Sequence, residues 1–164
     1  MTKSTNISIV PDPIDLKDRW ARNGHKSGIM WLTGLSAAGK STLAVELERR
    51  LFHAGFQTYV LDGDNIRHGL SSDLAFGPAE RSENIRRVGE VAALFAHAGA
   101  LCITAFISPY RSDRARVRAI APDLFHEIYI HADIDVCEKR DPKGLYRKAR
   151  AGLISDFTCV SAPY

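Results

Sequence analysis

Residues 34–41 read Gly-Leu-Ser-Ala-Ala-Gly-Lys-Ser, and this stretch decides the expected fold. Its residue types match the pattern G-x-x-x-x-G-K-[ST], the P-loop, whose main-chain N–H groups surround phosphate. The apolar run 29–33 precedes the loop, and residues 42–51 follow it with leucines at helical spacing. A buried strand, a glycine-rich loop and a helix form the context that this motif requires. A chance match in an ordinary glycine loop is the alternative, and these flanking elements count against it. The sequence therefore predicts a nucleoside triphosphate site.

Each residue type in this stretch, called the glycine loop below, has a physical role. Gly34 and Gly39 let the backbone turn tightly and approach phosphate without a Cβ in the way. Lys40 would reach the β- and γ-phosphates, and the Ser41 hydroxyl would ligate Mg²⁺. The predicted ATP-binding residues are Gly34, Leu35, Ser36, Ala37, Ala38, Gly39, Lys40, Ser41 and Thr42.

Length and composition indicate a single soluble domain. The chain has 164 residues and a net charge of +3, from 22 basic and 19 acidic side chains, which gives no argument for a nucleic-acid partner. Three cysteines stand apart in the sequence, without a C-x-x-C pair, as is typical of reduced thiols in a cytoplasmic protein. The polar start 1–6 predicts no signal peptide, and the longest apolar region, 91–107, reads as a helix end followed by a strand. We therefore expect no membrane contact.

Strands and helices alternate along the chain. Residues 1–27 read as an N-terminal extension with a short helix over 15–22. Further strands are predicted at 57–61, 100–106 and 127–130, and further helices at 79–98, 110–120 and 134–140. This order predicts an α/β fold of three layers around a mainly parallel central sheet. Because ligands on such sheets bind beyond the carboxyl ends of the strands, the order selects the loops 34–41, 62–67 and 106–110.

Two carboxylates follow the second predicted strand. Asp62 and Asp64 are two residues apart, so they share a face if the strand remains extended. One could hold Mg²⁺ through water, and the other could accept a proton from an attacking hydroxyl. The alternative is an ordinary turn, since Asp-Gly and Asp-Asn are common turn formers.

Several other side chains are candidates for binding an anion or a base. Arginine forks suit phosphate and sulfate, and Arg81 lies three residues before Asn84 on one predicted helix. Phe76 and Phe157 stand in polar surroundings, where each could stack on a base or anchor a loop to the core. Ser108 ends the third predicted strand and could contact the substrate or accept a phosphoryl group. No His or Lys in its local sequence marks it as activated, so substrate contact is the safer prediction.

Five ordered motifs together resemble the adenylylsulfate kinase (APS kinase) family, from about residue 31 to the end of the chain. They are Gly34-Leu-Ser-x-x-Gly-Lys-Ser-Thr-Leu, Leu61-Asp-Gly-Asp-Asn-Ile-Arg-His-Gly-Leu, Glu83-Asn-Ile-Arg-Arg-Val-Gly-Glu-Val, Phe106-Ile-Ser-Pro-Tyr-Arg and Arg140-Asp-Pro-Lys-Gly-Leu-Tyr. The resemblance implies a P-loop kinase domain over 28–164 with a mobile lid over about 141–158. It also implies transfer of the γ-phosphate of ATP to the 3′-hydroxyl of adenosine 5′-phosphosulfate (APS). The products would be PAPS and ADP, in sulfate activation.

The resemblance also implies roles for single residues. The implied catalytic residues are Lys40, Asp62, Asp64 and Ser108, with Asp62 the preferred proton acceptor and, together with Ser41, a ligand of Mg²⁺. In bacterial relatives the serine matching Ser108 is described as a phosphoserine intermediate, although we expect direct in-line transfer to dominate. The implied APS-binding residues are Asp62, Arg67, Phe76, Arg81, Asn84, Ile107, Ser108, Lys143, Leu145 and Phe157, with the two phenylalanines on opposite faces of the adenine.

The chain departs from the family pattern in three places. Ala37 and Ala38 stand where relatives usually have Gly or Ser, so a positive φ there would be costly. Asp156 and Cys159 stand where glycines are common. The family pattern continues past Tyr164 into another strand and helix, so we expect a chain truncated at the C-terminus.

The sequence leaves two alternatives open. The first is another small-metabolite P-loop kinase of the gluconate or shikimate type, which needs no paired aromatic residues. The second is a silent nucleotide-sensing module, against which the intact Lys40, Ser41, Asp62 and Asp64 count. Family likeness also predicts a homodimer and a fusion to, or association with, ATP sulfurylase.

Overall fold

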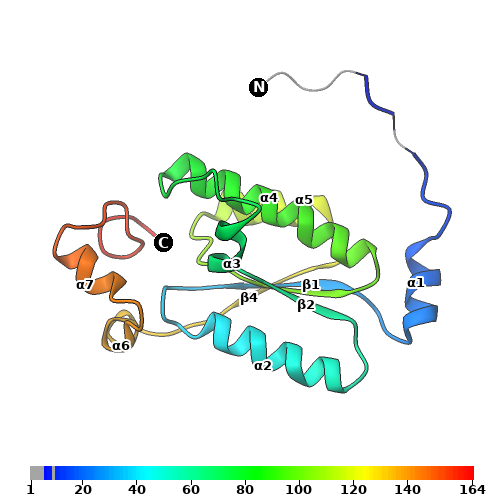
Figure 1. The fold of residues 1–164 in the computed structure, drawn as a ribbon, viewed down its shortest axis with the longest axis horizontal. Helices are drawn as coiled ribbons and strands as arrows, with labels where there is room; N and C mark the ends of the chain where they lie inside the picture. The colour runs from blue at the N-terminus through cyan, green and yellow to red at the C-terminus, as the bar shows by residue number, and fades with distance from the viewer. Residues whose placement is uncertain (1–5, 9) are drawn as a thin grey trace.

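The computed structural model describes residues 6–8 and 10–164 (Figure 1). The strands are β1 Gly28–Thr33, β2 Thr58–Asp62, β3 Leu101–Ala105 and β4 Phe125–Tyr129. The helices are α1 Leu16–Asn23, α2 Lys40–His53, α3 Gly63–His68, α4 Pro78–His97, α5 Arg111–Ile120, α6 Ile134–Arg140 and α7 Leu145–Arg150. All four strands are parallel, in the order β2-β3-β1-β4. The predicted α/β fold with a parallel sheet is confirmed.

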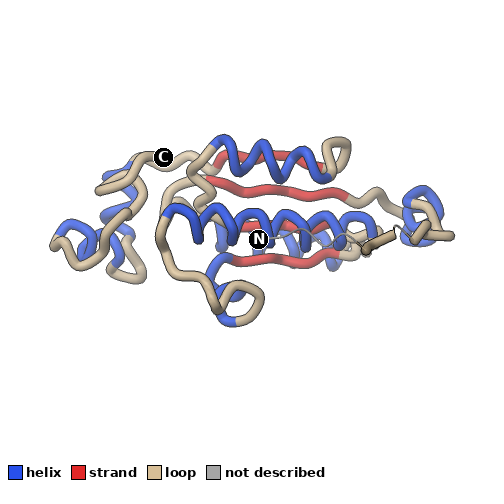
Figure 2. Tube along the Cα trace, turned by 90° about the horizontal axis from the view of Figure 1, so that it is seen from above, coloured by secondary structure: helices blue, strands red, loops and turns tan. Residues whose placement is uncertain are grey.

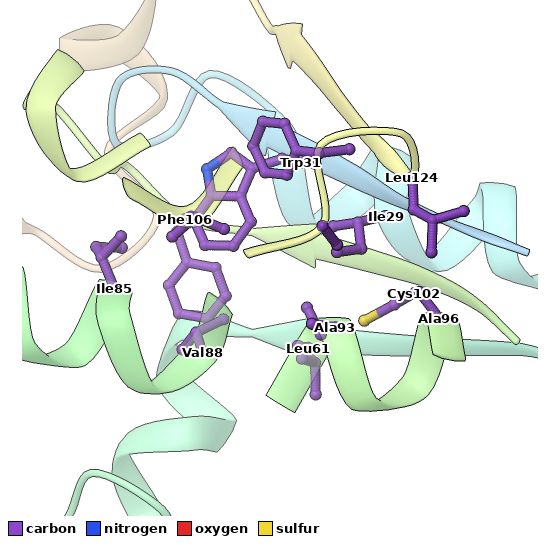
Figure 3. Close-up of a cluster of buried hydrophobic side chains, with 14 residues drawn as sticks. Ile29, Trp31, Leu61, Ile85, Val88, Ala93, Ala96, Cys102, Phe106 and Leu124 are labelled. Atoms are coloured by element: carbon purple, nitrogen blue, oxygen red, sulfur yellow. The ribbon is translucent and has the colours of Figure 1, made fainter. Parts of the chain in front are cut away.

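Helices cover both faces of the sheet. The helices α4 and α5 lie on one face and α2 lies on the other, which gives the three layers (Figure 1). Side chains of β1 alternate between the layers, as the pleat of a strand requires. Ile29 and Trp31 enter the core under α4 and α5, whereas Leu32 enters the core beside Ala44 of α2. Figure 3 shows Trp31 and Phe106 close together in the larger of these cores.

The long helix α4 confirms the helix predicted over 79–98 and presents an apolar stripe to the sheet. Pro78 occupies its first turn, where a missing N–H has no cost. Ile85, Val88 and Ala92 are buried against the sheet. Gly89 lets α5 approach closely, since a Cβ there would lie 2.7 Å from a methyl of Val117.

A third apolar cluster lies at the carboxyl end of the sheet, beside α6 and α7. Leu35 and Ala38 of the glycine loop pack there with Cys137, Tyr146 and Phe157. Both views place α6 and α7 at one end of the sheet and α1 at the other (Figure 1, Figure 2). The C-terminal segment therefore packs directly on the glycine loop.

The helix α1 is attached to the opposite, amino end of the sheet. Leu16 and Trp20 pack against the main core. The indole N–H of Trp20 donates to Ser27 Oγ at 2.8 Å, and the Asn23 amide donates to the carbonyl of Gly99 at 3.1 Å. Residues 1–5 and 9 of the predicted N-terminal extension lie outside the described residues.

The condition under which Asp62 and Asp64 would share a strand face is not met, and the alternative of a turn holds. The chain does not remain extended through Asp64, because β2 ends at Asp62 and the helix α3 begins at Gly63. The Asp62 carboxylate caps this helix by accepting the N–H of Asp64 at 3.0 Å. Short side-chain bonds of this type compete with an extended backbone, which is why Asp-Gly sequences turn. No helix among the described residues is long and apolar enough to cross a membrane.

Candidate active site

Most of the predicted site residues lie beyond the carboxyl ends of the parallel strands. The glycine loop follows β1, α3 follows β2, and residues 106–110 follow β3. Because β1, β2 and β3 are parallel, these three segments lie at the same end of the sheet, where the strands have their carboxyl ends. This placement matches the loops that the sequence selects.

The backbone of the glycine loop explains its two glycines. Gly34 has a φ of +147°, and a Cβ there would lie 2.5 Å from the carbonyl oxygen of Ile130. Gly39 has a φ of +105° and leads directly into α2. The N-terminus of α2, with its unpaired N–H groups, faces the loop and favours an anion there.

Lys40 is held inside this loop. Its side chain is buried, and its ammonium group donates to the carbonyls of Gly34 at 3.0 Å and Leu35 at 2.7 Å. Burial lowers the pKa of Lys40 to about 8, and the nearby Asp62 charge acts in the opposite direction. The lysine thus lies at the loop with a charge that an incoming polyphosphate would stabilise.

Ser41 and Asp62 form the part of the site that suits a magnesium ion. The Ser41 hydroxyl donates to a carboxylate oxygen of Asp62 at 2.6 Å. Hydroxyl and carboxylate oxygens are ligands that Mg²⁺ accepts, with waters and substrate phosphates completing its shell. Within the described part of the chain, no three His, Cys, Asp or Glu side chains cluster as a metal site. The hydroxyl of Ser41 and the carboxylate of Asp62 fit Mg²⁺ because this ion is usually held by one or two protein oxygens.

An open cavity of about 460 Å³ lies beside this pair, and Ser41, Asp62, Asp64 and Lys143 line it. The Lys143 ammonium forms an ion pair with the Asp64 carboxylate. Lys143 lies in the short segment between α6 and α7, so this pair joins the predicted lid to α3. The two carboxylates consequently differ, since Asp62 contacts the loop serine and Asp64 contacts the lid lysine.

Arg67 packs on one of the predicted base-stacking rings. Its guanidinium carbon lies 4.2 Å from the centre of the Phe76 ring, a cation–π arrangement. It also donates to the carbonyls of Leu74 at 3.1 Å and Ala75 at 3.0 Å. Arg67 thereby fixes the loop that presents Phe76.

Arg81 connects that loop to the C-terminal segment. Its guanidinium donates to the carbonyl of Phe76 at 2.8 Å and to the carbonyl of Asp156, and it lies 3.4 Å from Thr158 Oγ1. One turn further along α4, Asn84 is buried, and its amide oxygen has no hydrogen-bond partner among the described residues. Such a group suits a ligand donor.

The two predicted stacking residues have unequal surroundings. The Phe76 side chain is 64% exposed, whereas Phe157 is 7% exposed. The Phe157 ring packs edge-on against Tyr146, with 5.0 Å between ring centres. The structure brings both segments to Arg81, but only Phe76 presents its ring to solvent.

The Ser108 side chain is buried and is not exposed to solvent. It is 2% exposed, and its hydroxyl donates to Thr33 Oγ1 at 2.9 Å and accepts the indole N–H of Trp31 at 3.0 Å. Ser108 has a φ of +37°, and Arg114 donates to its carbonyl at 2.7 Å. These contacts favour a role in fixing the loop after β3, and they do not favour a phosphoserine. Its neighbour Ile107 is partly exposed.

Sequence reasoning missed two residues that contact the glycine loop from outside. Tyr146 donates its hydroxyl to the Ser36 carbonyl at 3.1 Å. Arg140 lies 3.3 Å from the Ala37 carbonyl and 3.5 Å from the Ala38 carbonyl. Both residues belong to the motif Arg140-Asp-Pro-Lys-Gly-Leu-Tyr, and no local pattern in this motif predicts a contact with the glycine loop. Leu145, a predicted APS contact, packs against the cluster around Tyr146 instead of standing free.

Comparison with known proteins agrees with this geometry. Residues 26–164 match the family model "Adenylylsulphate kinase". The chain is 56% identical over 165 aligned positions to an adenylyl-sulfate kinase of Staphylococcus epidermidis, with 100% of this chain and 83% of that protein covered. The chain belongs to the adenylylsulfate kinase family.

Solved structures agree with this family, and they also show that a kinase of another type shares the fold. An APS kinase structure from Mycobacterium tuberculosis, in complex with AMPPNP and APS, has a TM-score of 0.82 at 47% identity, covering 85% of this chain and 82% of that one. A gluconokinase from Sinorhizobium meliloti has a TM-score of 0.51 at 17% identity, covering 83% of this chain and 80% of that one, which shows a shared fold alone. Family membership therefore sets this ATP-binding chain apart from the gluconate-type alternative.

Proposed function

We propose that this adenylylsulfate kinase transfers the γ-phosphate of ATP to the 3′-hydroxyl of APS through the residues at the carboxyl edge of its sheet. The observation that carries the assignment of roles is the 2.6 Å contact between Ser41, which follows Lys40 at the end of the glycine loop, and Asp62. This contact supports a site in which the loop would bind phosphate and the hydroxyl and carboxylate oxygens would bind a cation. Phosphoryl transfer needs these parts because its catalysis rests on positioning and on charge stabilisation.

The donor half of the site would bind MgATP. Main-chain N–H groups of the loop and the N-terminus of α2 would hold the triphosphate. Lys40 would shift from the loop carbonyls to the phosphates. Ser41 and Asp62 would hold Mg²⁺, which when bound would supply positive charge that stabilises the negative charge developing during transfer.

The acceptor half would bind APS between α3, α4 and the C-terminal segment. Phe76 would stack on the adenine, and Arg67 and Arg81 would pair with the anionic groups, as arginine forks do. The open amide oxygen of Asn84 suits a donor on the sulfonucleotide. The M. tuberculosis relative, which was solved with AMPPNP and APS, supports this division into two halves.

The transfer itself would be a single in-line displacement. The 3′-hydroxyl oxygen forms a bond to the γ-phosphorus while the bond from that phosphorus to the β,γ-bridging oxygen breaks, and ADP leaves. The hydroxyl proton passes to the Asp62 carboxylate. Asp64, which is paired with Lys143, would hold the lid over the substrates.

The experiment is ADP release from the purified chain with MgATP, with and without APS, and with gluconate or shikimate in place of APS. APS-dependent release that the Asp62→Asn variant loses supports the proposal. Bound ATP without release, for every acceptor, would instead favour the sensing module. The homodimer, an association with ATP sulfurylase and a cytoplasmic location stay predictions, and light scattering with and without sulfurylase tests the first two.

A further inference from the structure

Two side chains from outside the glycine loop contact three successive carbonyls of that loop. Tyr146 of α7 donates to Ser36 at 3.1 Å, and Arg140 at the end of α6 lies 3.3 Å from the Ala37 carbonyl and 3.5 Å from the Ala38 carbonyl. The binding roles proposed above use neither residue. Their contacts fall on the part of the loop that would surround the phosphates.

Contacts to these carbonyls also fix the N–H groups of the loop. A trans peptide is planar, and its carbonyl and N–H point in opposite directions. Holding the Ser36 and Ala38 carbonyls from outside therefore directs the N–H groups of Ala37 and Gly39 to the other side. In the described chain neither of these two N–H groups meets a main-chain acceptor, whereas Ala38 N–H donates to Leu35 at 3.2 Å.

The loop also contains a strained residue that needs such support. Ala37 has a φ of +58°, in the left-handed region that an L-residue with a Cβ occupies at a cost of about 1–2 kcal/mol. A strained backbone persists only where its surroundings hold it. Contacts to the carbonyls on both sides of the Ala37 α-carbon provide that support.

Tyr146 is itself held rigidly. Its side chain is buried, and its ring packs edge-on against Phe157. The carboxylate of Asp141 accepts the N–H groups of Tyr146 at 3.2 Å and Arg147 at 3.1 Å, which fixes the start of α7. Burial raises the pKa of Tyr146, which favours the protonated hydroxyl that donates to Ser36.

We propose that Tyr146 and Arg140 are positioning residues that hold the carbonyls of Ser36, Ala37 and Ala38, keep the strained Ala37 in place and thereby aim the loop N–H groups at the triphosphate. The inference rests on the proposed function only in requiring that the loop bind ATP. It also gives the segment from α6 to α7 a role on the donor side of the reaction.

The test is AMPPNP binding by calorimetry in the presence of Mg²⁺. Tyr146→Phe removes the hydroxyl and keeps the ring, and we expect it to weaken binding about fivefold, the effect of one lost hydrogen bond. Arg140→Gln should weaken binding at least as much. In APS turnover, both changes should raise the KM for ATP by a larger factor than they lower kcat. Tyr129→Phe and Arg50→Gln are the matched controls, because in the described chain these exposed side chains donate to no carbonyl of the loop.

A double-mutant cycle separates positioning from a general loss of stability. Glycine accepts a positive φ, so Ala37→Gly removes the strain that the two residues support. We expect Tyr146→Phe to weaken AMPPNP binding less than twofold in the Ala37→Gly background, because contacting residues are coupled in this way. The same fivefold effect in both backgrounds would overturn the proposal, as would wild-type AMPPNP affinity in both Tyr146→Phe and Arg140→Gln. Because AMPPNP binding is measured without APS, a chain that binds AMPPNP but fails to turn over APS would contradict the proposed function alone.

Discussion

Phe76 and Phe157 receive the same adenine-stacking role from the sequence, but they are unequally buried in the structure. We therefore predict different effects when each ring is removed. We consider the changes Phe76→Ala and Phe157→Ala, each of which removes one aromatic ring. If both rings only sandwiched an adenine, the two variants would behave alike. In the structure Phe157 is 7% exposed and packs on Tyr146, whereas Phe76 is 64% exposed and contacts Arg67.

The expected magnitudes follow from these environments. Truncating a buried phenylalanine costs about 3–5 kcal/mol, because apolar contact is lost and a cavity remains. For a chain of this size, a loss of about 3 kcal/mol lowers Tm by roughly 6–12 °C. Phe76→Ala should change the free energy of unfolding by less than about 1 kcal/mol, the size of an exposed cation–π contact. Its loss of base stacking, about 1–3 kcal/mol, should raise the KM for APS by about 5- to 150-fold.

The assay pairs thermal unfolding with the dependence of ADP release on APS concentration for each variant. We expect a large fall in Tm only for Phe157→Ala, and a raised KM for APS with near wild-type Tm for Phe76→Ala. Equal Tm values for both variants, with the KM for APS raised in both, would refute the reasoning. That result would mean that the Phe157 ring is available to the substrate and contributes little to the core.

Three further predictions follow from single sites. Burial holds the pKa of Lys40 near 8, and bound phosphate favours the charged form of this lysine, so AMPPNP affinity should fall as pH rises through about 8. Protons should be taken up on binding, which calorimetry in buffers of different ionisation enthalpy measures. Lys40→Met should lack this proton uptake. Ser108→Ala leaves the Trp31 indole N–H without an acceptor and should cost about 1–3 kcal/mol in denaturant unfolding, while APS turnover persists; a folded but inactive variant would point to a phosphoserine instead. Gly89→Ala places a methyl 2.7 Å from Val117 and should lower stability by about 1–3 kcal/mol, so wild-type urea unfolding would contradict the close packing of α4 on α5.

The sequence by itself determined the features that depend on local pattern. The glycine loop, the alternation of strands and helices and the apolar stripe of α4 each follow from spacing over a few residues. Parallel order then placed the loops after β1, β2 and β3 at one edge, because a β-α-β connection leaves consecutive carboxyl ends on the same side. The turn at Gly63 was weighed as an alternative, and the helix α3 that follows it was not predicted.

Only the tertiary structure decided which distant side chains meet. Tyr146 contacts Ser36 and Arg140 contacts Ala37 across more than 100 residues of sequence, and no periodicity encodes such pairs. In the same way, Phe157 reads as an isolated aromatic residue in a polar tail, yet it is buried because the tail folds back onto Tyr146 and the glycine loop. Local spacing fixes where an element begins and which face is apolar. The environment of each site residue depends on how the completed layers pack, because burial and hydrogen bonding are properties of the assembled surfaces.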